Sequence, residues 1–239
     1  MTPLPDDAVA ATIVLLAHGS PDPRHAHGIE ALAARVAVLD PGREVRIAYL
    51  DHHGPTPGHI GHVLSVAGAD RDVVVVPALL SRAFHVEVDV PDAAAALATA
   101  YGRRVLLADA LGPDAAIGEA IGELLRRDRP SADGVVVYVA GSTRRAAVDE
   151  LLAAIAAGVP PGPHYAFATL DDYKPLDDAV GHLNGGAQVV GVSAMLAEGV
   201  LRDRMVARCR ADGIPFVGGV LGDTDAVARL VLARAAAAR

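Results

Sequence analysis

The sequence predicts an α/β protein made of two tandem modules, each a mainly four-stranded parallel sheet flanked by helices, with a cleft between the modules. Three observations support this prediction. Short β-branched runs alternate with helix-like stretches along the whole chain, the runs are continuously apolar, and the second half repeats motifs of the first. Continuous apolar strands are typical of parallel sheets covered on both faces. Strand–helix alternation favours right-handed crossover connections between parallel strands.

Eight short apolar runs are predicted as strands, four in each half. In the first half they are TIVLLA, EVRIAYL, DVVVVP and RVLLA, at residues 12–17, 44–50, 72–77 and 104–108. In the second half they are GVVVYVA, HYAFATL, QVVGVS and IPFV, at residues 134–140, 164–170, 188–193 and 214–217. Helices are expected after them, at residues 26–39, 57–67, 90–101, 114–128, 144–157, 175–183, 199–212 and 223–238.

The ends of the repeated strands differ in their histidines. VLLAHGS in the first half matches VYVAGS in the second if His18 takes the place of Ala140. A looser match after the third strand of each half places His85 over Leu201. The second half has therefore lost both of these histidines.

A third match supports a duplication and locates its boundary. Residues 49–64 align with residues 169–184 without a gap. Residues 129–134, between the halves, are rich in proline, glycine and charge, as is typical of a linker. We expect an N-terminal module at 1–130, which carries the active site, and a C-terminal module at 131–239, a degenerate repeat.

The composition excludes several classes of protein. Hydrophobic residues make up 52% of the chain, but aromatic residues only 3%, so we expect an aliphatic core. A net charge of −8 without a basic block predicts no nucleic-acid partner. The single cysteine, Cys209, excludes an internal disulfide framework and a cysteine-rich zinc site. No apolar run of about 18 residues and no signal pattern are present, so we expect a cytoplasmic protein without a membrane partner.

Several catalytic motifs are also absent. The chain has no phosphate-binding loop of the G-x-x-x-x-G-K-[ST] type, no G-x-G-x-x-G after a strand and no G-x-S-x-G elbow. A His-Gly step after the first strand also occurs in histidine phosphatases. Those enzymes need an arginine immediately before the histidine, where this chain has Ala17.

Three residues are candidates for a metal site. His18 follows the first predicted strand, Asp51 the second and His85 the third. The carboxyl ends of parallel strands are where α/β sheets bind ligands. Two imidazoles and a carboxylate make an open divalent-metal site that suits Fe, Co or Ni. The alternatives are a hydrogen-bonded turn residue for His18 and a helix cap for Asp51.

The motifs LLAHGSPDPR, YLDHHGPTPG and VVVVPALLSRAFHVEVDVP resemble those of the class II tetrapyrrole chelatases, specifically the sirohydrochlorin cobalto- and ferrochelatases of the CbiX and SirB type. The resemblance covers the whole chain, since the longer members of the family are tandem α/β modules. It implies ATP-independent insertion of Fe²⁺ or Co²⁺ into sirohydrochlorin, in sirohaem or cobalamin biosynthesis. The partner is then the tetrapyrrole, and the metal (Fe²⁺, Co²⁺ or Ni²⁺) is a substrate, with no permanently bound cofactor.

The resemblance assigns roles to particular residues. His18 and His85 are implied to handle the metal and accept protons, and Asp51 stands where the family usually has a glutamate, a difference that His52 or His53 could compensate. Four residues beside them are expected to bind the substrate: Ser20, Arg24, Ser81 and Arg82. Arg46 is a further candidate partner for the carboxylates of the macrocycle.

One working site per chain is expected, in a monomer or weak homodimer. Two alternatives to a chelatase remain open. The first is a non-catalytic carrier of metal or tetrapyrrole on the same fold. The second is a degenerate paralogue whose second half is purely structural.

Overall fold

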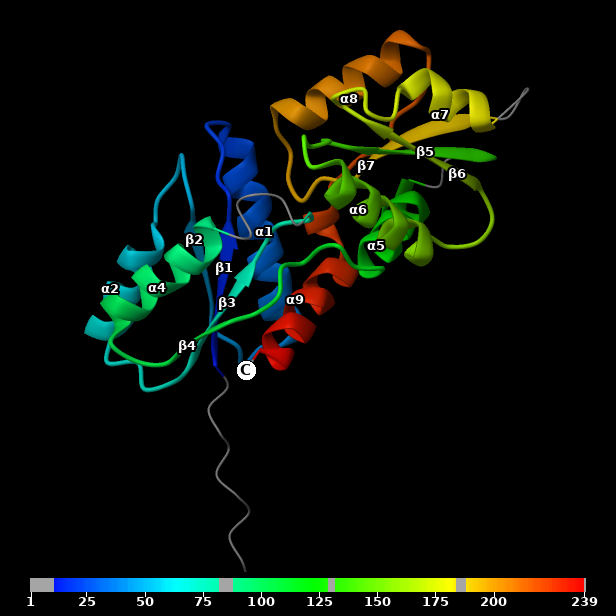
Figure 1. The fold of residues 1–239 in the computed structure, drawn as a ribbon. Helices are drawn as coiled ribbons and strands as arrows, with labels where there is room; N and C mark the ends of the chain where they lie inside the picture. The colour runs from blue at the N-terminus through cyan, green and yellow to red at the C-terminus, as the bar shows by residue number, and fades with distance from the viewer. Residues whose placement is uncertain (1–10, 82–87, 129–131, 184–187, 239) are drawn as a thin grey trace, which may run out of the picture.

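The structure contains two parallel β-sheets, one in each half of the chain (Figure 1). It is a computed structural model, and it describes residues 11–81, 88–128, 132–183 and 188–238. The first sheet has the order β2-β1-β3-β4, built from β1 (Thr12–Ala17), β2 (Val45–Tyr49), β3 (Val73–Pro77) and β4 (Val105–Leu107). The second has the order β6-β5-β7, built from β5 (Gly134–Val139), β6 (His164–Thr169) and β7 (Val189–Ser193). The prediction of two α/β modules with parallel sheets is confirmed.

All eight predicted helices are present. They are α1 (Pro23–Leu39), α2 (Pro57–Val66), α4 (Asp89–Tyr101), α5 (Ala116–Asp128), α6 (Arg145–Gly158), α7 (Leu176–Leu183), α8 (Val200–Ala211) and α9 (Asp225–Ala237), with a short 3-10 helix η1 (Leu221–Asp223) before the last. Helix α1 begins three residues earlier than predicted. The reason is that the carboxylate of Asp22 accepts a hydrogen bond from the backbone of Arg24, and Pro23 suits the first turn.

The prediction of a fourth strand in the second sheet, at residues 214–217, is wrong. This segment forms only an isolated parallel bridge between Gly191 of β7 and Phe216. The Gly191 N–H donates to the Pro215 carbonyl, and the Val217 N–H donates to the Gly191 carbonyl, both at 2.8 Å. Pro215 has no N–H to offer a ladder, so pairing does not extend beyond these two bonds. Within the described ranges, the second sheet thus has three strands.

Both faces of the first sheet are covered, which explains its continuously apolar strands. Ile13 and Leu15 of β1 belong to one buried cluster, together with residues of α1 and α9. Val14 and Leu16 belong to another, together with residues of α2 and α4. Because alternate side chains of a strand point to opposite faces, each strand needs apolar residues at every position.

The two halves repeat each other in backbone conformation as well as in sequence. Gly19 and Gly141, which follow β1 and β5, have φ angles of +94° and +85°. His52 and Asp172, which follow β2 and β6, have φ angles of +62° and +57°. A non-glycine residue in this left-handed region is uncommon. The occurrence of such a residue at matching positions indicates that the same turns were kept in both halves.

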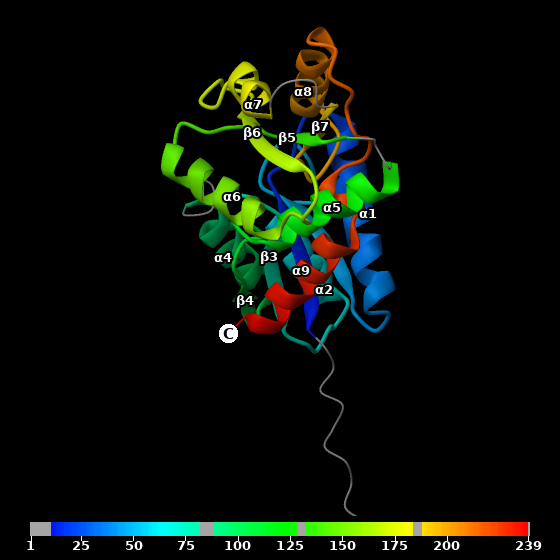
Figure 2. The ribbon, with the colours of Figure 1, turned by 90° about the vertical axis from the view of Figure 1, so that its right-hand side faces the viewer.

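The last helix of each half packs on the first helix of the other half. Helix α5 ends the first half in sequence but packs against α6, whereas α9 ends the second half and packs against α1. Figure 2 shows α5, α9 and α1 side by side near the centre of the molecule. This exchange is reciprocal, because α1 and α6 occupy equivalent positions after β1 and β5.

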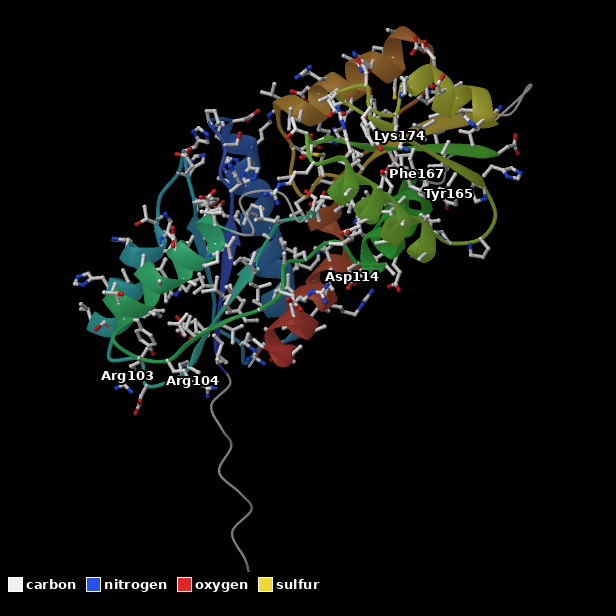
Figure 3. The ribbon with its side chains drawn as sticks, viewed as in Figure 1. Arg103, Arg104, Asp114, Tyr165, Phe167 and Lys174 are labelled. Atoms are coloured by element: carbon white, nitrogen blue, oxygen red, sulfur yellow. The ribbon has the colours of Figure 1, made fainter. Side chains whose placement is uncertain are left out.

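The exchange joins the two sheets through one continuous core. A single buried cluster contains Ile13 of β1, Val137 of β5 and Val227 of α9. On its border, Arg234 of α9 donates to the carboxylate of Asp114, 2.8 Å away, just before α5 (Figure 3). The walls of any cleft between the halves are thereby held in a fixed relation. Within the part of the chain that the structure describes, no helix is both long and apolar enough to cross a membrane.

Candidate active site

The turn after β1 brings His18 next to Asp51. Ala17, the last residue of β1, is fully buried, and His18 follows it at the carboxyl edge of the sheet. The Asp51 N–H donates to the His18 carbonyl at 2.9 Å. A Cβ at position 19 would overlap the Asp51 carbonyl oxygen, so only Gly19 allows this close approach. The backbone therefore fixes the distance between these two candidate residues.

The orientation of the His18 ring favours the tautomer with its proton on Nδ1. Its Nδ1 lies 3.2 Å from the Gly19 carbonyl oxygen, an acceptor to which a protonated Nδ1 donates. In that tautomer Nε2 carries the ring's lone pair, the position that binds a metal or takes up a proton. The ring centroid of His52 lies 6.3 Å from that of His18.

Two cavities share His18 as a wall. The first, of about 200 Å³, lies between the halves and is mostly apolar. Its wall combines Leu79, Leu80 and Ser81 of the first half with Ala140 and Met195 of the second, among others. The second cavity, of about 580 Å³, is lined by His18 and by the carboxylates Asp51, Asp89 and Asp92. His18 thus stands between an apolar cleft and an acidic cavity.

Asp51 is exposed and does not cap a helix. Helix α2 is capped by Thr56, whose side chain accepts from the backbone of His59, so the alternative of a cap role for Asp51 is wrong. The Asp51 carboxylate instead accepts a hydrogen bond from the His52 N–H at 2.7 Å, and it lies 3.6 Å from His52 Nε2. With 68% of its side chain exposed, it can receive a ligand from solvent.

Arg24 already has two carboxylate partners. Its guanidinium donates to Asp22 and to Asp203 of α8, each at 2.6 Å in the closest contact. These hydrogen bonds hold the pKa of Asp22 and that of Asp203 below their usual range. Arg24 therefore links the two halves, and a carboxylate of the substrate would have to replace one of these partners.

The remaining predicted site residues divide into three groups. Ser81 lines the cleft, whereas the Ser20 hydroxyl accepts from the Asp22 N–H at 3.1 Å within the turn after β1. Arg82 and His85 lie outside the described residues. Arg46 is paired with Glu44 at the amino end of β2, the edge of the sheet opposite His18, so the suggestion that it serves the site is wrong.

The described ranges contain no group of three His, Cys, Asp or Glu side chains arranged to hold a metal ion. His85, the third candidate ligand, belongs to the segment between Ser81 and Val88. Of the described residues that flank it, Ser81 lines the apolar cleft and Asp89 lines the acidic cavity.

His25, for which no role was predicted, lines the apolar cleft together with His18. It is the third residue of α1, and its Nδ1 is buried without a hydrogen-bond partner among the described residues. Burial above all, and then the charges of His53 and His18, hold the pKa of His25 below its usual range. Its place was predictable in principle, because the first turn of a helix that follows a strand lies at the same edge of the sheet.

The second half has the same turns but pairs its carboxylates with arginines. Asp171, the counterpart of Asp51, binds Arg145, and the following Asp172 binds Arg208. The hydrogen bond from Arg208 holds the pKa of Asp172 below its usual range. In place of an imidazole beside a carboxylate, the second half thus presents Ala140 beside an ion pair.

The fold defines the class of the protein. The structure resembles that of SirB from Bacillus subtilis with Fe³⁺, with a TM-score of 0.73, 20% sequence identity and 94% of each chain covered. It also resembles CbiX, described as the terminal enzyme for biosynthesis of siroheme in denitrifying bacteria, with a TM-score of 0.65, 23% identity, and coverage of 93% of this chain and 98% of that one. The two-module architecture is thus that of the SirB and CbiX structures.

The sequence comparison finds a family match in the first half of the chain. The family model of CbiX matches residues 12–128, which include β1 to β4 and the candidate residues of the first half. None of the curated proteins matches the sequence significantly.

Proposed function

We propose that this chain is a sirohydrochlorin chelatase, which inserts Fe²⁺ or Co²⁺ into sirohydrochlorin without ATP, in the biosynthesis of sirohaem or cobalamin. The observation that carries the proposal is the position of His18, at the carboxyl edge of β1 within the match to the CbiX family. There it separates an apolar cleft from an acidic cavity. The reaction needs both environments, one for a flat macrocycle and one for a cation.

In this proposal the macrocycle binds in the apolar cleft between the halves. Its rings contact the aliphatic walls, such as Leu80 and Met195, while its carboxylates reach polar groups at the rim. Ser20, Arg24, Ser81 and Arg82 are the proposed rim contacts. Arg24 would exchange Asp203 for a substrate carboxylate, which keeps its guanidinium paired throughout.

The divalent ion is a substrate, and it approaches from the acidic side. Asp51 lines the acidic cavity with Asp89 and Asp92, and a cavity lined by carboxylates attracts cations. His18, Asp51 and His85 would hold the ion until the nitrogens of the macrocycle displace them. Nitrogen and oxygen ligands suit such transient binding, because thiolates would retain the ion more strongly.

Proton removal is the chemical step that the protein must assist. Each pyrrole N–H that faces the ion has to lose its proton before that nitrogen can bind the metal. A neutral imidazole accepts such a proton near neutral pH. His18, with its lone pair on Nε2, is one described residue placed to do so.

We further propose that residues 1–130 hold this one site and that residues 131–239 form a degenerate repeat without the site histidines. The second half supplies Ala140, Met195 and other cleft walls. The protein would act in the cytoplasm, as a monomer or weak homodimer, with the tetrapyrrole as its partner and with no nucleic-acid or membrane partner.

The test is the rate of metal insertion. Sirohydrochlorin is mixed with Co²⁺ or Fe²⁺, and the change in visible absorption is followed with and without the protein. We expect multiple turnovers, and we expect His18→Ala to reduce the rate by about 10²–10⁴-fold, the usual range for losing a proton-transfer group. Stoichiometric binding of metal or macrocycle without turnover would instead identify a carrier and overturn the proposal.

A further inference from the structure

His25 is a second imidazole that faces the cleft. It and His18 are the two histidines among the described residues that line the cavity between the halves. His25 lies in the first turn of α1, whose amino end points toward this edge of the sheet. Its Nδ1 is buried and has no hydrogen-bond partner within the described ranges. A buried polar atom without a partner is costly and needs an explanation, of which a catalytic role is one.

The groups around His25 keep its ring neutral. Burial is the main reason that its pKa is lowered, and the charges of His53 and His18 act in the same direction from the turns after β2 and β1. The Tyr49 ring lies 6.5 Å away between centroids. Asp22 favours protonation of His25, but its carboxylate is already bonded to Arg24. The positive end of the α1 dipole also disfavours an imidazolium in the first turn.

The proposed reaction needs more proton acceptors than His18 and His85 provide. Two pyrrole N–H bonds break, both electron pairs stay on ring nitrogens and pass to the metal ion, and two protons leave. A histidine that is holding the ion cannot accept a proton at the same time, because both processes use the same lone pair. If His85 is the last of the two to release the ion to the ring nitrogens, His18 can accept one proton after it has released the ion, and a second acceptor is needed for the other proton.

We infer that His25 is a further catalytic residue. Its Nδ1 first accepts a hydrogen bond from a pyrrole N–H of the macrocycle and then takes up that proton, the second of the two that leave. The inference rests on the proposed chelatase function. It assigns the unpartnered Nδ1 to a substrate N–H and gives each leaving proton its own imidazole, His18 for one and His25 for the other.

The test compares two histidines of one helix. His25→Asn retains a hydrogen-bonding group near the position of Nδ1 but cannot take up a proton. His27→Asn makes the same change two residues away, at an exposed position, and serves as the matched control. Initial rates of Co²⁺ insertion into sirohydrochlorin are measured between about pH 5 and 9, with circular dichroism to check folding.

We expect His25→Asn to lower kcat by about 10²-fold or more, as for loss of a general base, with little change in KM. We also expect a changed pH profile and partial recovery with added imidazole for His25→Gly. His27→Asn should behave as the unaltered protein. Normal turnover of His25→Asn, or a rise in KM with an unchanged pH profile, would overturn the inference.

A second measurement is independent of turnover. Protein with isotope-labelled histidine is titrated with metal-free sirohydrochlorin, and the His25 Nδ1 resonance is identified by its absence in His25→Asn. Binding should shift this resonance, and saturation of the protein without any shift would refute the contact. Failure of the proposed function looks different, because the unaltered protein would then insert no metal at all.

Discussion

Gly19→Ala should damage both stability and catalysis, and the structure gives the size of the effect. Its φ of +94° is unfavourable for alanine, which costs about 1–2 kcal/mol. The added Cβ also overlaps the Asp51 carbonyl, and overpacking of this kind costs about 1–3 kcal/mol. The sum is about 2–5 kcal/mol of unfolding free energy. At about 2–4 °C per kcal/mol for a chain of this size, Tm should fall by roughly 4–20 °C.

Two other glycines isolate the two contributions. Gly68→Ala has the same backbone problem, with φ of +65°, but its Cβ has no atom of the described structure within 4 Å, so only about 1–2 kcal/mol should be lost. Gly141→Ala is the counterpart in the second half, where the Cβ meets the side chain of Asp171, which can move only by weakening its pairing with Arg145. The loss of stability should therefore increase from Gly68 to Gly141 to Gly19.

The assay combines thermal unfolding with the rate of Co²⁺ insertion, measured well below each Tm. Only Gly19→Ala should lower the rate, by about 10²-fold, because its overlap separates Asp51 from His18 and small misplacements of reacting groups are that costly. If Gly19→Ala were as stable as Gly68→Ala and fully active, the close approach of the two turns would have no role in the site.

Three further outcomes are expected. Asp203→Asn removes one of the two carboxylates on Arg24, so KM for sirohydrochlorin should fall while kcat stays unchanged; an unchanged KM would show that Arg24 does not bind the substrate. Because the native pKa of His25 is lowered, the unfolded chain takes up this proton first as pH falls below about 6.5. Stability should therefore decrease below that pH, and the decrease should be smaller in His25→Asn, as chemical denaturation at several pH values can test. Ala140→His should not restore metal insertion in a His18→Ala background, and recovery of activity would show that the second half retains a usable site.

Much of the fold was predictable because both faces of each sheet are covered. That arrangement forces continuous apolar strands, and these are easy to recognise in a sequence with few aromatic residues. The run at 214–217 was misleading because its composition suits a strand, while Pro215 and the glycines at 218 and 219 limit its pairing to one bridge. The exchange of α5 and α9 was missed, because periodicity shows that a helix has an apolar face but not which half that face contacts.

The site was predictable where it depends on topology and not where it depends on side-chain partners. Residues that follow neighbouring parallel strands must lie at one edge, so the proximity of His18 and Asp51 could be deduced from the sequence. The pairing of Arg24 with Asp203 could not, because 179 residues separate them. His25 was overlooked for a related reason, since the sequence does not show which side chain in the first turn of a helix lines a cavity.

The comparison of the two halves separates the parts of the motif that serve the fold from those that serve the proposed chemistry. Gly19 and Gly141 share a left-handed backbone and a close contact with the following turn, so this feature is structural. Asp51 and Asp171 also recur, and both accept hydrogen bonds from the backbone of their own turn. The carboxylate therefore has a partner within the turn itself in both halves, and in the second half it also pairs with Arg145. The differences that remain are imidazoles, because Ala140 stands where the first half has His18 and Leu201 matches His85 in the aligned sequence. Loss of His18 alone would leave this turn complete in its backbone but without the imidazole that the proposed chemistry uses.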